Sequence, residues 1–423
     1  MRARFITAAF WSLWGAIIGR GLTLLAWVVA ARLLGNRAFG EVGMIQSTLG
    51  LFGVFAGAGL GLTTTKYVAE YRNLYGVRAR QSIALSIQIA IITGTIVAVV
   101  LLVLADWMAA SLLGAPHLVW ALRLAAGLII FEAINGVQVG AMAGLEAFQT
   151  MALVTMLRAG FLLGGMVLGS YLAGVTGAVA GLVMAGGVSA LANQIALRRL
   201  CPGLSLILGY NEVDWEQFDV LWRFSSFALL SSLFTMPAMW LSNVILVGQP
   251  QGYDALGIFN AADRWRQLLL FLPSSLSTLV LSMLSHLHGT KDTGNYGKIF
   301  GANLGVNVGI VLLPALGLII FAPAAMAIFG PAYQGGGVTL MILAISAVFF
   351  VLNNLLGQVL VSKGAIKWRC GLDALQAVVL VGCSWGLIPI YKENGLALAY
   401  LIAFVVTVLG LLLPVRHYLR KSG

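Results

Sequence analysis

Charged residues are scarce in this chain of 423 residues: only 9% are Asp, Glu, Lys or Arg, whereas 60% are hydrophobic. A soluble globular domain carries charge at about a quarter of its positions. The shortage of charge excludes a soluble protein with a large core and indicates an integral membrane protein. The first residues are basic and then apolar, without a small-residue cleavage site. We therefore expect a first spanning helix there and not a removed signal peptide.

Cysteine and histidine are also few, with three and four residues. The cysteines are Cys201, Cys370 and Cys383, whose scattered spacing excludes a disulfide framework and a zinc site. The sequence contains no nucleophile elbow, no Walker-type phosphate loop and no pair of metal-binding histidines. We therefore predict that the chain is not an enzyme and carries no cofactor.

Long apolar stretches are what the sequence has instead. A helix of about 20 apolar residues spans the hydrocarbon core, and about twelve stretches are of that kind. They cover residues 6–34, 42–65, 83–105, 118–143, 151–171, 174–197, 221–247, 254–284, 299–322, 333–361, 369–390 and 394–415. This pattern predicts an all-α membrane protein with two six-helix lobes, 1–198 and 221–423, and a cytoplasmic interfacial linker over 199–220.

Positive charge is distributed unevenly between the loops. With the N-terminus in the cytoplasm, 18 of the 25 Lys and Arg residues lie on the cytoplasmic side, Arg158 and Arg369 among them, and four on the opposite side. Lys and Arg collect in cytoplasmic loops, so both termini are predicted to be cytoplasmic. The same bias explains the net charge of +11 without a nucleic-acid partner.

Two short segments resemble each other at equivalent places in the two halves. "GNRAFGEVGMIQS" at Gly35 follows the first stretch, and "GQPQGYDALGIFNAADR" at Gly248 follows the seventh. Because six helices return the chain to its starting side, the halves are predicted to be parallel repeats about an axis along the membrane normal. Many transporters have this architecture and bind their substrate between the halves.

Three arginines are assigned to neither side and remain inside the predicted helices, namely Arg20, Arg264 and Arg266. An arginine near the bilayer centre costs at least about 2.5–3.5 kcal/mol, so each needs a partner or a watered cavity. Arg20 is predicted to lie near the midplane, in an ion pair or in an anion site. Asp263 and Arg266 are three residues apart and can pair along one helix face. That pairing leaves Arg264 for the cavity, and the reverse assignment stays open.

Glu132 is a carboxylate in the middle of its stretch, beside Asn135 and Gln138. We expect it to be protonated, to be bonded to a neighbouring helix, or to form a cation or proton site for coupling. Further polar candidates are Gln46 and Asn260 for a cavity, and Lys66 and Arg72 for headgroup contact at the cytoplasmic interface.

The opening "FWSLWGAIIGRGLTLLAWVVAARLLGNRAFGEVGMIQS" resembles that of the Wzx-type polysaccharide flippases. These belong to the multidrug/oligosaccharidyl-lipid/polysaccharide exporter superfamily. The family's "LLG…FG" turn corresponds to Leu33–Gly40, and its charged "YVAEYR"-like segment to Tyr67–Arg72. "GYDALGIFNAADRW" is similar to the start of the family's eighth helix.

This resemblance implies a flippase that moves a polyprenyl-pyrophosphate-linked oligosaccharide from the inner to the outer leaflet by alternating access, for cell-surface polysaccharide such as O-antigen. In the branch that carries lipid-linked peptidoglycan precursors, arginines on the first, second and eighth helices bind the pyrophosphate. Arg20 and Arg264 match by helix and depth, Arg266 is a further candidate, and the second helix here has no mid-membrane arginine.

The same resemblance implies a place in the bacterial cytoplasmic (inner) membrane and an ion gradient as the driving force, with the ion unspecified. The implied partners are the lipid-linked sugar, membrane lipids and the polysaccharide polymerase machinery. A monomer suffices because the chain supplies both lobes.

Two other functions stay open at this point. A cation-coupled drug or metabolite antiporter of the same superfamily would favour acids in its cavity, whereas the mid-membrane balance here is slightly cationic. That balance sets three arginines, Arg20, Arg264 and Arg266, against Glu132 and Asp263. A non-transporting membrane scaffold would tolerate substitution of Arg20.

Overall fold

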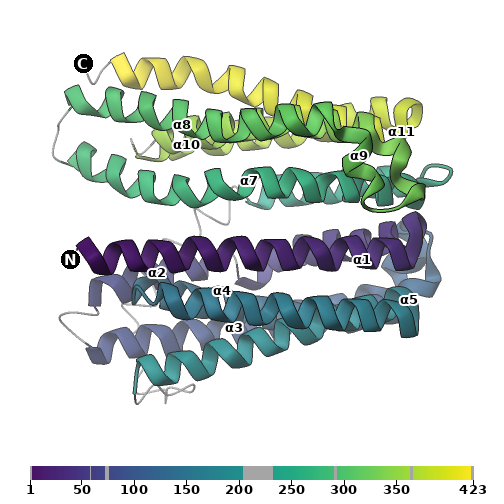
Figure 1. The fold of residues 1–423 in the computed structure, drawn as a ribbon, viewed down its shortest axis with the longest axis horizontal. Helices are drawn as coiled ribbons and strands as arrows, with labels where there is room; N and C mark the ends of the chain where they lie inside the picture. The colour runs from purple at the N-terminus through teal and green to yellow at the C-terminus, as the bar shows by residue number, and fades with distance from the viewer. Residues whose placement is uncertain are drawn as a thin grey trace. The chain divides into compact units, whose positions relative to one another are not determined.

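The computed structural model of the chain describes residues 2–57, 59–71, 76–202, 232–289, 293–362 and 365–420. Within these ranges every regular element is a helix (Figure 1). Seven helices of the described residues are long and apolar enough to cross a membrane. The predicted class, an all-α membrane protein, is confirmed. Most of the predicted linker over 199–220 lies outside the described residues.

The chain forms two compact units. The first consists of Met1–Leu34 with Glu41–Met236, and the second of Gly35–Gly40 with Pro237–Gly423. The short turn that follows the first apolar stretch therefore packs with the C-terminal part of the chain.

The first unit is built from long helices, two of which change direction at a glycine. α1 (Arg2–Gly57) has non-helical angles at Gly35, with φ 74° and ψ 174°, and α5 (Phe148–Leu200) has them at Ala173 and Gly174. A positive φ favours glycine, which lacks a Cβ. The elements between them are α2 (Leu60–Tyr71), α3 (Gly76–Trp107), the π-helix η1 (Met108–Leu112), the 3-10 helix η2 (Pro116–Leu118) and α4 (Val119–Gly144).

The second apolar stretch is interrupted where the sequence predicted one continuous helix over 42–65. α1 ends at Gly57 and α2 begins at Leu60, and Gly59 between them has a φ of 85°. A right-handed helix does not accommodate that angle, so the prediction of an uninterrupted helix is wrong here.

Glycines bring α4 close to its neighbours in the first unit. A Cβ added to Gly61 of α2 would lie 2.7 Å from the carbonyl oxygen of Gly136, and one added to Gly144 would lie 2.8 Å from that of Thr65. Small residues let membrane helices approach and gain van der Waals contact. These glycines thus serve the packing of α2 against α4.

The elements of the second unit are the part from Pro237 onward of a helix over Ser232–Val247, followed by α7 (Gly252–Gly289), α8 (Thr293–Ile320), α9 (Ala322–Ala327), the 3-10 helix η4 (Pro331–Gly336), α10 (Gly337–Ser362) and α11 (Ile366–Arg420). In this unit, α7, α8 and α11 pack against α10. Leu269, Val311, Val351 and Leu355 form one buried cluster that joins α7, α8 and α10. α11 changes direction at Lys392, where φ is 48°.

The turn Gly35–Gly40 is held in the second unit by an aromatic cluster. Phe39 is 1% exposed, and its ring centroid lies 6.0 Å from that of Tyr333 and 6.4 Å from that of Phe329. Gly40 packs on the carbonyl oxygen of Tyr253, and Gly257 packs on the backbone of Asn36. The two segments that resemble each other in sequence therefore contact each other.

Candidate functional site

Arg20 lies on the exposed face of α1, beside the contact between α1 and α5. A Cβ on the preceding residue, Gly19, would lie 2.9 Å from Cγ2 of Thr155, and Gly15 packs on Ala152 of the same helix. The two glycines let α1 approach α5 closely. As a result, the backbone of α1 at Arg20 lies near the level of residues 155–156 of α5.

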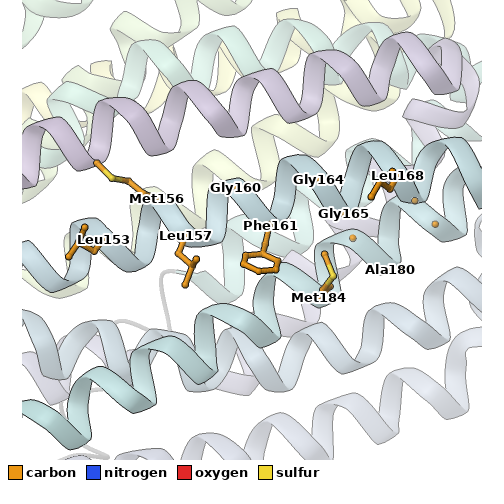
Figure 2. Close-up of a pocket in the computed structure, with 13 residues that line it drawn as sticks. Leu153, Met156, Leu157, Gly160, Phe161, Gly164, Gly165, Leu168, Ala180 and Met184 are labelled. Atoms are coloured by element: carbon orange, nitrogen blue, oxygen red, sulfur yellow. The ribbon is translucent and has the colours of Figure 1, made fainter.

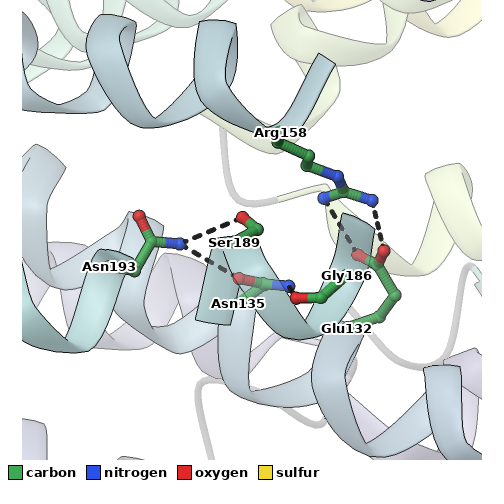
Figure 3. Close-up of polar contacts among 6 residues, drawn as sticks. All are labelled: Glu132, Asn135, Arg158, Gly186, Ser189 and Asn193. Carbon is green, nitrogen blue, oxygen red and sulfur yellow. Dashed lines mark hydrogen bonds and ion pairs between the residues drawn. The ribbon is translucent and has the colours of Figure 1, made fainter. Parts of the chain in front are cut away.

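Glu132 is bound to a residue that the sequence reasoning did not connect with it. Its carboxylate forms an ion pair with Arg158 of α5, in which Nη1 lies 3.4 Å from Oε2 and Nη2 donates to Oε1 (Figure 3). The two side chains are 43% and 39% exposed. The charge count assigned Arg158 to the cytoplasmic side and did not suggest this pair; in the structure Arg158 is part of α5. Glu132 is therefore bonded to a neighbouring helix, one of the roles expected for it.

The amides near Glu132 connect α4 to the second arm of α5. Asn135 Nδ2 donates to the carbonyl oxygen of Gly186 at 3.1 Å, and Asn135 Oδ1 accepts from Asn193 Nδ2 at 3.0 Å (Figure 3). Gln138 donates to the carbonyl oxygen of Ala190 at 3.1 Å. These bonds are buried, so the two amides stabilise helix packing in the first unit.

The Glu132–Arg158 pair can be tested by removing one charge or both. We expect Glu132→Gln and Arg158→Gln each to lower the free energy of unfolding by about 1 kcal/mol, because each leaves a half-buried charge without its partner. The double variant should recover most of that loss. Thermal unfolding in detergent measures the three variants, and a double variant as unstable as the sum of the singles would contradict the pairing.

The remaining polar candidates of the first unit were predicted on the second arm of α1 and on α2. Gln46 is half-buried on the second arm of α1, and Lys66 is exposed on α2, with its Nζ 5.0 Å from the ring centroid of Tyr67. Arg72 lies outside the described residues.

Asp263 and Arg266 form the predicted pair in the second unit. Arg266 lies 2.6 Å from Asp263 Oδ1 and is 8% exposed, and its guanidinium carbon lies 5.5 Å from the ring centroid of Tyr400. The carboxylate and the aromatic face together stabilise this buried cation. The sequence prediction of this pair is confirmed.

Arg264 lies beside the pair and is joined to it through an amide. Its Nη1 donates to Gln267 Oε1 at 3.4 Å, and Gln267 Nε2 donates to Asp263 Oδ2 at 2.7 Å. Asn260 is one turn before Arg264, and its buried Nδ2 has no hydrogen-bond partner among the described residues. Asn260 and Arg264 therefore share a helix face that carries hydrogen-bond donors.

A further charged cluster, between α10 and α11, was missed by the sequence reasoning. Arg369 Nη2 lies 2.9 Å from Asp373 Oδ1, and Nη1 donates to the carbonyl oxygen of Asn353 at 3.1 Å. A Cβ on Gly357 would overlap this guanidinium, so glycine makes room for it. In the sequence, the feature that could have indicated this pair is the spacing of four residues between Arg369 and Asp373, which places both on one helix face. Because both charges are partnered, we interpret the cluster as a tie between the two helices.

No group of three or more His, Cys, Asp or Glu residues that could hold a metal ion is found in the part of the chain that the structure describes.

The long apolar helices are those of a multi-pass membrane protein. The profile of a family described as "Polysaccharide biosynthesis protein" matches residues 6–285, and the chain belongs to that family. The predicted resemblance to polysaccharide flippases is confirmed.

Two relatives have names that state an activity. The chain is 23% identical over 431 residues to the Lipid III flippase of Escherichia coli K12, which covers 94% of this chain and 95% of that protein. It is 25% identical over 202 residues to the "Probable flippase AglR" of Haloferax volcanii, which covers 46% of this chain and 41% of that protein. These relatives are flippases and not enzymes, in agreement with the sequence prediction.

Solved structures show the same fold at low sequence identity. An inward-facing multidrug resistance MATE family transporter of the MOP superfamily has a TM-score of 0.80 at 18% identity, over 96% of this chain and 98% of the other. A MOP superfamily transporter from Pyrococcus furiosus has a TM-score of 0.75 at 18% identity, over 98% and 96%. The transporter fold therefore extends over nearly the whole chain.

Proposed function

We propose that this protein is a flippase that transfers a polyprenyl-pyrophosphate-linked oligosaccharide from the inner to the outer leaflet of a bacterial cytoplasmic membrane, by alternating access, for export of a cell-surface polysaccharide. The observation that carries the proposal is the similarity to the Lipid III flippase along 94% of the chain, together with the family match over 6–285. The similarity to the "Probable flippase AglR" over 202 residues supports the same activity.

The proposed topology has twelve crossings in two six-helix lobes, related as parallel repeats, with both termini in the cytoplasm. Changes of direction at Gly35, Gly174 and Lys392 divide three long helices into two arms each and support this number. The excess of Lys and Arg in the predicted cytoplasmic loops supports the orientation.

The proposed headgroup ligands are Arg20 in the first unit and Arg264 in the second. A pyrophosphate inside a low-dielectric layer is strongly destabilised unless it is paired. Guanidinium groups stay charged and donate forked hydrogen bonds that suit phosphate oxygens. Arg266 is engaged with Asp263, so we assign it the role of holding Arg264 in place. Gln46 and Asn260 are proposed to contact the polar part of the substrate, and Lys66 to contact lipid headgroups.

The drug-antiporter alternative gains no specific support. The likeness to MATE transporters is at 18% identity and concerns the fold. The arginines within the helices favour an anionic substrate over the cationic ones that such antiporters carry. The proposed driving force is an ion gradient, and the proposed partners are the lipid-linked sugar and membrane lipids.

Transfer in reconstituted vesicles tests the proposed function. A polyprenyl-pyrophosphate trisaccharide with a fluorescent sugar is placed in both leaflets, and a membrane-impermeant quencher reports how fast the inner pool reaches the outside. We expect protein-containing vesicles to expose the inner pool faster than protein-free vesicles, and faster still under an imposed ion gradient. Equal rates with folded protein would contradict the proposal.

A further inference from the structure

A large apolar groove runs along α5 in the first unit (Figure 2). Its volume is about 990 Å³, at the upper end of the range of about 300–1,000 Å³ for ligand pockets. Its lining on the first arm extends from Leu153 to Gly169, and the second arm contributes Gly177 to Met184. From Leu153 to Gly169 the groove is about 24 Å long at 1.5 Å per residue, most of the thickness of a hydrocarbon core of about 30 Å.

The two arms of α5 meet at one end of the groove and separate toward the other. Gly169 and Gly177 are in backbone contact, and a Cβ on Gly165 would lie 3.1 Å from Cα of Gly181. Away from this contact, larger side chains form the walls, and Figure 2 shows Phe161 of the first arm beside Met184 of the second. The groove is therefore a fixed feature of the hairpin, closed by glycine contacts at its narrow end.

The floor of the groove is open at two glycines. A Cβ added to Gly160 or to Gly164 would meet no atom within 4 Å. Neither glycine is required by close helix packing, in contrast to Gly169 and Gly177. A methyl group at either position would therefore project into the groove without meeting another atom.

Charged groups border this apolar groove. Arg158 follows the lining residue Leu157 directly in the sequence. Its ion-pair partner is Glu132. A Cβ added to Gly186, two residues after the lining residue Met184, would lie 3.9 Å from Oε1 of Glu132. Arg20 lies at the level of the lining residue Met156, through the contact of Gly19 with Thr155. Arg158 is paired with Glu132, so the cation considered for an anionic head at this level is Arg20, and the apolar channel is complementary to a long hydrocarbon chain.

We infer that the α5 groove binds the polyprenyl chain of the lipid-linked substrate, with the chain along Gly160 and Gly164 and the phosphate end toward the level of Arg20. This inference rests on the proposed function for the identity of the lipid. An isoprenoid chain is bulkier than a straight acyl chain because each repeat unit carries a methyl branch. Glycines on the groove floor leave room for those branches, which a lining of leucines would not.

Photolabelling tests binding without requiring transport. A polyprenyl phosphate with a diazirine in its chain is added to protein in vesicles of phosphatidylethanolamine and phosphatidylglycerol, and the crosslinked peptides are mapped. We expect crosslinks between residues 153 and 184. The double variant Gly160→Leu/Gly164→Leu should lower them at least about tenfold, which corresponds to about 1.4 kcal/mol. Gly386→Leu is the matched control, because Gly386 of α11 also has open space at its Cβ and lies outside the groove.

Three outcomes would overturn the inference. They are no prenyl crosslinks at residues 153–184 of the unsubstituted protein, unchanged crosslinks in the double variant, or equal labelling by a diazirine phosphatidylethanolamine that the polyprenyl phosphate does not displace.

Transfer of the fluorescent substrate is measured in parallel and should fall about tenfold in the double variant. If the unsubstituted protein binds the prenyl probe in the groove but transfers no substrate, the groove assignment stands and the proposed transport function fails. Thermal unfolding shows whether the double variant is folded, and the unsubstituted protein gives the crosslink map without any substitution.

Discussion

Replacing Arg20 by alanine is expected to slow transfer of the lipid-linked oligosaccharide by about tenfold to a hundredfold, with little change in the amount of folded protein. A hydrogen bond to a charged group contributes about 1.5–3 kcal/mol, and each 1.4 kcal/mol is about a factor of ten. Arg20 is on the exposed face of α1, so its removal leaves no cavity in the core. The quenching assay described above measures the rate.

Two further variants show whether the effect on transfer is specific to the guanidinium of Arg20. Arg20→Lys keeps the charge and loses the planar fork, so we expect an intermediate rate. Arg32→Ala removes an exposed arginine from the same helix, nearer its turn at Gly35, and should leave transfer unchanged. Wild-type transfer by Arg20→Ala would rule out the headgroup role and favour a function that does not need this cation.

Gly40→Ala is expected to destabilise the second unit by about 3 kcal/mol, the upper part of the usual range for overpacking. The added Cβ would overlap the carbonyl oxygen of Tyr253 and would lie 2.9 Å from the amide nitrogen of Gly257. These are backbone atoms, so no change of rotamer relieves the clash. The turn Gly35–Gly40 must then move, and Phe39 loses part of its contact with Tyr333. A lower thermal midpoint in detergent measures the effect.

The control for this prediction is a glycine on the same helix with room around it. A Cβ on Gly50 would meet no atom within 4 Å, so Gly50→Ala should leave the midpoint unchanged or raise it slightly, as alanine favours helix. An unchanged midpoint for Gly40→Ala would mean that the turn is not held against Tyr253.

The sequence by itself determined the class of the protein and most of its helices. Hydrophobic length is a local property, because each apolar stretch must satisfy its own backbone hydrogen bonds in lipid, and no distant residue is needed to recognise it. The reversal at Gly35 and the pair of Asp263 with Arg266 were predictable for the same reason, since they depend on neighbouring residues. The resemblance to polysaccharide flippases was also carried by short local segments.

Only the tertiary structure decided which distant residues are partners. Glu132 and Arg158 are 26 residues apart, on different helices, and their pairing depends on how α4 packs against α5. The same holds for the turn Gly35–Gly40, which packs with residues more than 200 positions later in the chain. The glycines show most clearly what the sequence alone does not determine. Gly169 and Gly177 hold two helical arms together, while Gly160 and Gly164 leave a groove open. A residue without a side chain takes its role from the atoms opposite it, and those atoms are set by the fold.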